Sequence, residues 1–129
     1  MSATTQWQGR KWIRDEKRLA IYLRDGLCCA YCGATVEEGA SLSLDHVRPR
    51  SKGGRNEAAN LVTCCCRCNS SRQDRPLAAW LRAVAEYRGM DEAELARHVR
   101  NCRSRQIDVA GAKKIIARRG GLTAALASC

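Results

Sequence analysis

The sequence contains no phenylalanine, and it has only three tryptophans and three tyrosines among 129 residues. This scarcity of large aromatic side chains predicts a modest hydrophobic core. A chain of this length forms one ordinary domain, or a small core with an appendage, so a large two-lobed enzyme is excluded. Small cores are commonly stabilised by a bound metal, so metal ligands are expected.

Long apolar runs are also missing. No segment approaches the roughly 18 apolar residues that a membrane span needs, and the start, Met1 to Gln6, lacks the apolar stretch of a secretory signal. We therefore expect a cytoplasmic setting and no membrane partner. In a reducing compartment, nine cysteines are more often metal ligands or free thiols than disulfides, and the odd number agrees with this.

Acidic residues are few relative to basic ones. The chain has 13 Asp and Glu against 23 Lys and Arg, which gives a net charge of +10. Basic side chains displace counterions from phosphates, so this excess favours a polyanionic partner, most simply nucleic acid. A basic surface without any partner explains the composition equally well, and other features must decide between the two.

The apolar pattern divides the chain near Arg75. Residues 1–75 are predicted to form a core with an amphipathic helix over Lys11–Arg24, and residues 76–129 a helical C-terminal extension. The extension is expected to contain three helices: one that begins at Pro76 and ends at Gly89, one that is capped by Asp91 and Glu94, and one from about Asp108 to Arg119.

The central part of the chain predicts strands. Ser41–Val47 alternates polar and apolar residues, and Asn60–Thr63 is short and contains β-branched residues. A loop over Arg48–Gly54 separates them, and Arg67–Arg72 is expected to form a short helix. The predicted order is therefore strand, loop, strand, helix, which is an α+β arrangement.

Two Cys-x-x-Cys pairs flank these strands. The first pair is Cys29 and Cys32, and the second is Cys65 and Cys68. Four thiolates from two such pairs close a tetrahedral zinc site, so we predict structural zinc. Cys28, Cys64 and Cys66 adjoin the pairs without fitting the spacing. The alternative to a zinc site is that the cysteines are small buried apolar residues or form a redox pair.

Polar residues suited to hydrolytic chemistry lie between the two pairs and directly after the second. They are Asp45, His46, Asn60 and Asn69. Carboxylate and amide oxygens suit a hard divalent cation, and an imidazole accepts a proton from water near neutral pH. An Asp-His pair alone is more often an ordinary surface or capping pair, so its significance depends on the surrounding pattern.

Taken together, these elements resemble the HNH endonuclease family. The resemblance covers about Arg24–Arg72 and joins the cysteine pairs to Leu44–Gly54, Asn60–Val62 and Asn69 in the order and approximate spacing of the family. It implies a ββα-metal fold, in which two strands and a helix surround one catalytic divalent ion. We therefore expect a small ββα-metal core, a zinc site formed by four cysteines, and a helical extension.

The resemblance also implies roles for the polar residues. His46 corresponds to the general base that activates water, and Asp45 and Asn69 to the ligands of a catalytic Mg²⁺ or Mn²⁺. Asn60 corresponds to the middle Asn of the motif, which holds the loop and the base in position. The sequence departs from the family name at the last position, where Asn69 replaces His, and this leaves the metal preference open.

The implied reaction is hydrolysis of DNA phosphodiester bonds, with 5′-phosphate and 3′-hydroxyl products. Basic residues in and after the loop are expected to hold DNA phosphates, although a solvated basic loop is the alternative; they are Arg48, Arg50, Lys52, Arg55 and Arg72. Two other functions remain open: a noncatalytic zinc-stabilised nucleic-acid-binding module, and an accessory subunit that has a protein partner in a phage or bacterial DNA-processing complex.

Some further residues are expected to be structural. His98 and Cys102 are spaced like ligands on one helix face, but a partly buried structural His fits the apolar seam around them better. Trp7, Trp12 and Trp80 are expected to pack in the core rather than stack on bases. Cys102 and Cys129 are predicted free thiols, and the basic stretch Lys113–Arg119 is nearly as well explained by solvation as by DNA contact.

Overall fold

The computed structural model describes residues 12–127, so Trp7, Lys11 and Cys129 lie outside the described residues. The helices are α2 (Asp15–Arg24), α3 (Cys66–Arg72), α4 (Leu77–Arg88), α5 (Glu92–Ser104), α6 (Val109–Arg119) and α7 (Leu122–Ala127), and the strands are β1 (Leu42–His46) and β2 (Leu61–Cys65). Short 3₁₀ turns span Arg50–Lys52 and Ala58–Asn60. The α+β class is confirmed.

The two strands form one antiparallel sheet at the centre of the molecule. Leu42 pairs with Cys65 at one end of the ladder, and His46 pairs with Leu61 at the other. Every residue of β2 is buried, whereas β1 is only partly covered. β2 extends two residues beyond the predicted end at Thr63, and α3 begins directly after it. The predicted order of strand, loop, strand and helix is confirmed.

The end of α2 is fastened to β2 by a buried carboxylate. Asp25 accepts hydrogen bonds from Nε and Nη2 of Arg24 and from the backbone N–H of Thr63 at 2.8 Å. Arg24 in turn donates to the carbonyl oxygens of Ala58 and Leu61. These contacts fix α2 across the sheet. The helix begins at Asp15 rather than at Lys11, with Arg14 in extended conformation at its N-cap.

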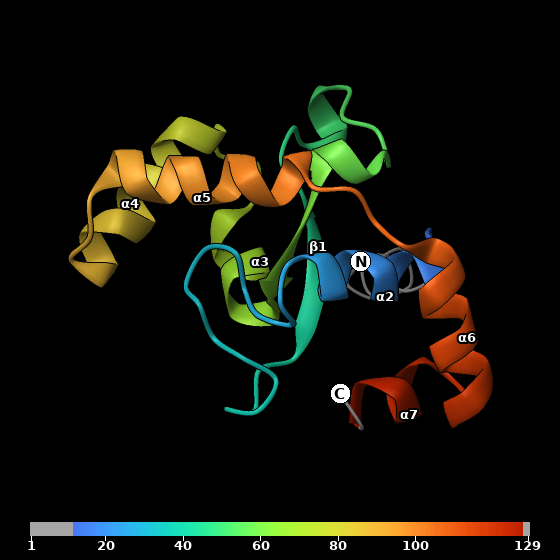
Figure 1. The fold of residues 1–129 in the computed structure, drawn as a ribbon. Coiled ribbons are helices and arrows are strands. Elements are labelled where there is room, and N and C mark those ends of the chain that lie inside the picture. Colours follow the sequence, from blue (N-terminus) through green and yellow to red (C-terminus); the bar gives the residue numbers. More distant parts are fainter. Residues whose placement is uncertain (1–11, 128–129) are drawn as a thin grey trace.

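The main hydrophobic core crosses the expected boundary at Arg75. Tyr31, Val62 and Cys64 from the first part pack in one cluster with Trp80 of α4 and Val99 of α5. Figure 1 shows the α4–α5 pair at one end of the molecule and α6–α7 at the other, with β1 and α2 between them. The secondary structure after residue 75 is helical, but α4 and α5 pack in the same hydrophobic core as the residues before it.

The helix ends largely follow local sequence signals. The Asp91 side chain accepts from the backbone N–H of Glu94 at the start of α5, and Gly89 ends α4 in the left-handed conformation. Asp108 caps α6 in the same way by accepting from Gly111. Helix α7 was not predicted from the sequence. It packs with α6 against α2 through Ala20, Ala112 and Ala125.

None of the helices within residues 12–127 combines the length and the apolar composition needed to cross a bilayer.

The buried Arg24–Asp25 pair predicts a large effect of substitution. In the variant Asp25→Ala, the Arg24 guanidinium, whose side chain is 1% exposed, loses its counter-charge. Breaking a buried pair by removing one partner costs about 3–5 kcal/mol of unfolding free energy. Urea denaturation of the metal-loaded protein measures this loss.

The matched control is Asp74→Ala, which removes an exposed carboxylate. A surface change of this kind alters the unfolding free energy by only about 0.5 kcal/mol or less. Equal stability of the two variants would contradict the role assigned to Asp25.

Candidate functional site: a cysteine cluster and the end of β1

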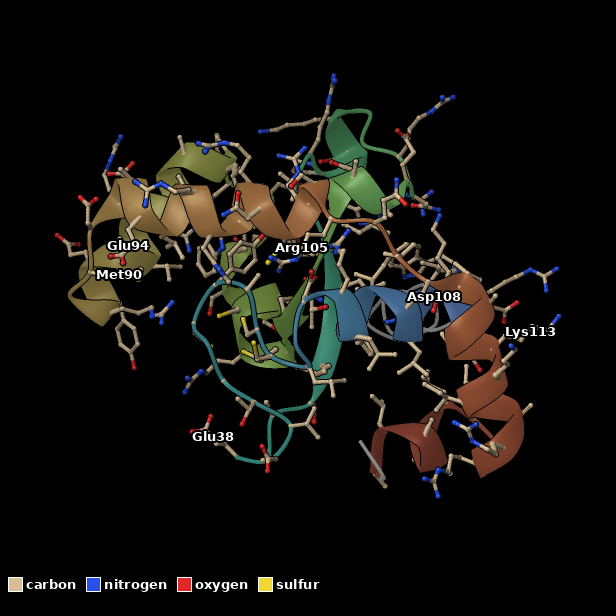
Figure 2. All side chains as sticks on the ribbon, in the orientation of Figure 1. Glu38, Met90, Glu94, Arg105, Asp108 and Lys113 are labelled. Atoms are coloured by element: carbon tan, nitrogen blue, oxygen red, sulfur yellow. The ribbon has the colours of Figure 1, made fainter. Side chains whose placement is uncertain are left out.

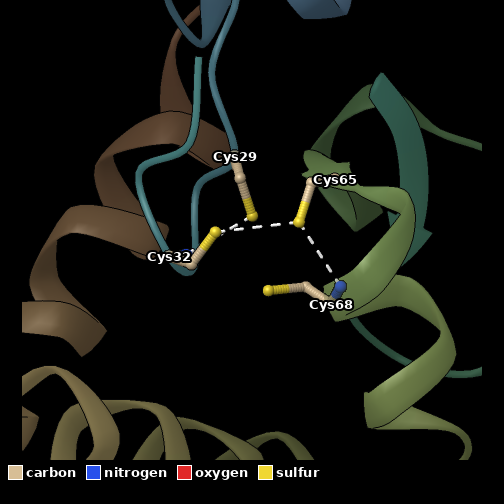
Figure 3. Close-up of side chains that lie close together, drawn as sticks. All are labelled: Cys29, Cys32, Cys65 and Cys68. Atoms are coloured by element: carbon tan, nitrogen blue, oxygen red, sulfur yellow. Dashed lines mark hydrogen bonds between the residues drawn. The ribbon is translucent and has the colours of Figure 1, made fainter. Parts of the chain in front are cut away.

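The four cysteines of the two Cys-x-x-Cys pairs converge in space. The sulfur atoms of Cys29, Cys32, Cys65 and Cys68 all lie within 4.8 Å of one another, and Figure 3 shows them facing a common centre. One pair lies in the loop after α2, and the other spans the junction of β2 and α3. The structure therefore confirms that these four cysteines are placed to hold a metal ion.

The backbone around the cluster favours thiolates. The N–H of Cys32 donates to Sγ of Cys29, and the N–H of Cys68 donates to Sγ of Cys65, each at 3.4 Å. The contact with Cys68 lowers the pKa of Cys29 and raises the pKa of Cys68 in turn. The backbone N–H donors stabilise the deprotonated sulfur that a metal ligand requires.

The neighbouring cysteines are separated from this cluster. Cys64 is completely buried in the core, and its burial raises the pKa of its thiol well above the usual range. Cys66 is exposed, and Cys28 donates to the carbonyl oxygen of Asp25. Spacing therefore selected Cys65 correctly from its run of three cysteines.

A cavity of about 280 Å³ adjoins the cysteine cluster and not the end of β1. Cys32 and Cys68 line it on one side, and Trp80 and Tyr87 of α4 line it on the other. The Nε1 atom of Trp80 is buried without a hydrogen-bond partner among the described residues. The cavity therefore belongs to the region of the cysteine cluster. A second polar region, formed by oxygen and nitrogen groups, lies at the end of β1.

Asp45, near the end of β1, is a buried carboxylate held by two donors. Its Oδ2 atom accepts from the Tyr31 hydroxyl at 2.5 Å and from Nη1 of Arg72 at 2.6 Å. The residue is 8% exposed. The Oδ1 atom accepts no hydrogen bond from the described residues, so this oxygen is the one available to a ligand.

Arg72 does not fit its predicted role as a phosphate contact. It is 0% exposed, and besides Asp45 it donates to the carbonyl oxygens of His46, Val47 and Arg75. A buried charge requires this kind of pairing, and α3 places Arg72 against β1. We therefore correct the expectation: Arg72 is part of the framework that holds Asp45.

His46, the last residue of β1, is held by a residue that the sequence analysis missed. Its Nε2 atom lies 2.8 Å from Oδ1 of Asn56, and its ring lies 4.7 Å from the ring of Trp12. When Nε2 donates to the amide oxygen, Nδ1 keeps its lone pair. Burial lowers the pKa of His46 below its usual value, and the bond to Asn56 opposes this shift. Burial therefore favours the neutral form of the imidazole.

Asn60 organises the loop rather than the imidazole. Its Oδ1 accepts from the N–H of Arg48, and its Nδ2 donates to the carbonyl oxygens of Arg48 and Arg55. The loop passes so close that a Cβ atom at Gly54 would overlap the carbonyl oxygen of Arg48. Asn60 thus fixes both ends of the segment 48–55, and Asn56 contacts the histidine.

Asn69 lies beside the same face of β1 as Asp45. Side chains two residues apart on a strand share a face, so Ser43 and Asp45 point to one side and His46 to the other. Nδ2 of Asn69 donates to Oγ of Ser43 at 3.3 Å. The structure therefore places Asp45 and Asn69 on the α3 side of β1, and His46 on the side of Trp12.

The remaining predicted DNA contacts form an exposed loop after β1. Arg48, Arg50, Lys52 and Arg55 are all exposed. One hydrogen bond within the loop and one to the segment after α3 order it: Nε of Arg48 donates to the carbonyl oxygen of Lys52, and Nζ of Lys52 donates to that of Asp74. Four of the five predicted residues are thus accessible to a phosphate, and Arg72 is not.

The residues that were expected to be structural differ in their burial, and one of them, Trp12, lies at the end of β1. His98 is exposed on α5, and its Nε2 lies 3.7 Å from Sγ of the buried Cys102. It is therefore less buried than the sequence suggested. Trp80 is buried in the core as expected, and Trp12 is half-buried against His46. Figure 2 shows Lys113 projecting outward from α6, at the end of the molecule opposite to Met90.

Comparison with known proteins identifies the region that contains both polar sites. Residues 29–82 match the sequence profile of the HNH endonuclease family. This segment of the chain is similar to HNH endonuclease domains. It includes both cysteine pairs, all of β1, β2 and α3, and the first half of α4. The resemblance noted in the sequence is therefore confirmed for this segment.

Two curated relatives are endonucleases of far greater length. The CRISPR-associated endonuclease Cas9 of Corynebacterium diphtheriae is 38% identical over 74 residues, which cover 57% of this chain and 7% of that protein. The protein of the same name from Actinomyces naeslundii is 39% identical over 67 residues, which cover 51% of this chain and 6% of that protein. The chain thus spans less than a tenth of either relative.

A solved structure is also similar to this chain. It is the crystal structure of the Type II-C Cas9 enzyme from Actinomyces naeslundii, with a TM-score of 0.46 and 24% sequence identity. The similarity covers 81% of this chain and 15% of that chain.

The surroundings of His46 predict its titration. Because burial disfavours the imidazolium, we expect the pKa of His46 to lie below the 6.5 of a free imidazole. Proton NMR of the His46 Hε1 resonance against pH, in the absence of added magnesium or manganese, measures the midpoint. A midpoint at or above 6.5 would contradict the assignment.

The variant Asn56→Ala provides the sign test. It removes the hydrogen bond that raises the pKa of His46, so the midpoint should move further down. The exposed His98 serves as an internal control, because Asn56→Ala should leave its Hε1 resonance at each pH unchanged.

Proposed function

We propose that this chain is a metal-dependent DNA endonuclease that hydrolyses phosphodiester bonds, with His46 as the general base. The family assignment supports nuclease chemistry, and the placement of Asp45, His46 and Asn69 around one strand supports these residues as its centre. The observation that carries the proposal is the environment of His46: its Nε2 lies 2.8 Å from Oδ1 of Asn56, and burial favours the neutral ring. When Nε2 donates to Asn56, Nδ1 is left to accept a proton.

The cysteine cluster fits zinc in a structural role. With Zn–S bonds of about 2.3 Å, tetrahedral geometry separates the sulfur atoms by about 3.8 Å. The sulfur atoms of Cys32 and Cys65 lie 3.7 Å apart, and all four sulfurs lie within 4.8 Å. Four protein ligands leave no open position for substrate, so this ion would stabilise the fold and take no part in hydrolysis.

The oxygen donors near β1 fit a hard cation instead. Oδ1 of Asp45 accepts no hydrogen bond from the described residues, and the amide oxygen of Asn69 stays available when Nδ2 donates to Ser43. Carboxylate and amide oxygens suit Mg²⁺ or Mn²⁺, which commonly bind through one or two protein ligands and keep several waters. When bound, such an ion supplies charge stabilisation for the phosphate and the leaving oxygen.

The residues of the chain perform the proton transfer and the positioning. His46 Nδ1 removes a proton from the attacking water, which a neutral imidazole does efficiently near pH 7. Asn56 holds the ring in the required tautomer. Asn60 fixes the loop in which Arg48 and Arg55 are exposed to the DNA backbone.

The edge of β1 explains how groups on opposite faces reach one phosphate. Within the described residues β1 pairs only with β2, so its second edge is not bonded to another strand there. Asp45 and His46 are consecutive residues at the end of this strand, and their Cα atoms are about 3.8 Å apart. A phosphate at this end of β1 is within reach of both side chains and of the basic loop that follows.

The zinc assignment predicts different behaviour for two nearby cysteines. Cys68→Ser removes one of the clustered ligands and should lower the zinc content and the thermal stability of the purified protein, because structural zinc contributes folding free energy. Cys66→Ser changes an exposed cysteine outside the cluster and should keep one zinc ion per chain. Elemental analysis and thermal denaturation measure both properties. Equal zinc content in the two variants would contradict the ligand assignment.

The endonuclease proposal is tested by plasmid cleavage with purified protein. We expect cutting with Mg²⁺ or Mn²⁺, no cutting with chelator, and a loss of at least about 100-fold in His46→Ala, since positioned acid–base groups contribute this much. His98→Ala, which changes the other histidine on an exposed helix face, is the control and should cut at the wild-type rate.

The negative outcomes separate the alternatives. If His46→Ala cuts at the wild-type rate, His46 is not the base. If folded, zinc-loaded protein binds DNA but cuts with neither metal, the nucleic-acid-binding module replaces the enzyme. Cleavage that appears only with a copurified partner would indicate an accessory subunit.

A further inference from the structure

Tyr31 links the cysteine cluster to the end of β1. It lies between Cys29 and Cys32 in the first Cys-x-x-Cys pair, and it is completely buried. Its hydroxyl donates to Oδ2 of Asp45, which belongs to a different element. A single side chain thus connects the loop that holds two metal-binding sulfurs to the carboxylate at the candidate catalytic site.

Arg72 shares this carboxylate oxygen with Tyr31 but cannot orient the group alone. Its Nη1 donates to Oδ2 of Asp45, whereas its Nε and Nη2 atoms donate to backbone carbonyl oxygens, including that of Val47. Arg72 therefore supplies one bond to the carboxylate and not the two-pronged contact that fixes both oxygens. The Tyr31 hydroxyl supplies the second hydrogen bond, and both hydrogen bonds are accepted by Oδ2. The Oδ1 atom accepts neither of them.

The rest of the structure holds Tyr31 rigidly. The ring of Trp80 meets the ring of Tyr31 edge-on, with centroids 5.5 Å apart and an interplanar angle of 88°. Nη1 of Arg88 donates to the Tyr31 carbonyl oxygen at 2.6 Å. Both contacts come from α4, so the helical part of the chain braces the cysteine loop at the residue that reaches Asp45.

We propose that Tyr31 is a positioning residue, which fixes Asp45 so that its Oδ1 atom is presented to the catalytic divalent cation. The proposal rests on the proposed function, since that function makes Asp45 a metal ligand. Residues that hydrogen-bond to a metal ligand orient it, and their loss typically lowers metal affinity by about 10–100-fold. The same contact makes the geometry of the cysteine cluster a determinant of the Asp45 orientation.

The matched experiment compares two buried tyrosines. Tyr31→Phe removes the hydroxyl and keeps the ring that packs on Trp80. Tyr22→Phe is the control: Tyr22 is 2% exposed, and its hydroxyl donates to the carbonyl oxygen of Leu42, also on β1, while accepting from Arg18. Both variants lose one buried hydroxyl, but only Tyr31→Phe changes the surroundings of Asp45.

The measurement is the affinity for Mn²⁺ without DNA, obtained from the electron paramagnetic resonance signal of free Mn²⁺. The full chain is used in its zinc-loaded form, because Mn²⁺ binds such sites more weakly than zinc and leaves the thiolates occupied. Zinc content and circular dichroism are recorded for each variant. Asp45→Asn, which keeps an oxygen acceptor for Tyr31 and Arg72, shows which part of the binding depends on the Asp45 charge.

We expect Tyr31→Phe to bind Mn²⁺ about 10-fold more weakly than wild type, with zinc content unchanged, and Tyr22→Phe to bind with wild-type affinity. Equal affinities in Tyr31→Phe and wild type would overturn the positioning role and leave the proposed function intact. Equal weakening in both tyrosine variants would also overturn it, because the effect would then reflect general loosening. Wild-type protein without Asp45-dependent Mn²⁺ binding would overturn the metal assignment and this inference together.

Discussion

The arrangement of this domain depends on the hydrogen bonds of one buried group, the guanidinium of Arg72. From inside α3 it donates to Asp45, to the carbonyl oxygens of His46 and Val47 at the end of β1, and to that of Arg75 before α4. A fully buried cation is costly unless its donors are paired. Satisfying this one group therefore fixes the helix, the strand end and the path toward α4 relative to one another.

The two polar regions differ in the chemistry of their donors. The cysteine cluster offers four sulfur atoms with backbone N–H groups directed at two of them, which suits a soft ion with no open position. The end of β1 offers oxygen donors and a neutral imidazole, which suit a hydrated hard ion and proton transfer. In the proposed function, this division lets one ion support the fold while the end of β1 binds the second ion and the substrate. Tyr31 joins the two regions through one hydrogen bond.

The helices after residue 75 contribute to this domain. Trp80, Leu81 and Val84 of α4 enter the main core with Tyr31 and Val62. Arg103 of α5 also donates to the carbonyl oxygen of Ala59, beside the turn that carries Asn60. The family match at 29–82 likewise continues into α4. Helices α6 and α7 pack instead on α2, through small side chains.

Much of the architecture followed from the sequence because its signals are local. Strand alternation around Leu44, the capping residues Asp91 and Glu94, and the stop at Gly89 each act within one or two turns of chain. The spacing of the two cysteine pairs was similarly decisive, since two residues between ligands suit a tetrahedral ion, and it singled out Cys65 from its neighbours. The Asp45-His46 pair was noted in the sequence because carboxylate and imidazole groups suit hydrolytic chemistry and because the surrounding pattern resembles the family.

Only the tertiary structure decided which partners these groups have. Arg72 carries the positive charge expected of a DNA contact. However, α3 directs its side chain inward, where the buried carboxylate of Asp45 requires a counter-charge. Asn56 lies ten positions after His46 in an irregular loop, where no periodicity signals a contact. Tyr31 was only a residue between two cysteines until folding brought β1 beside it. Local patterns determined the elements and the metal-binding sulfurs, whereas long-range burial and hydrogen bonding determined how the site is held, because those depend on residues that are distant in the chain.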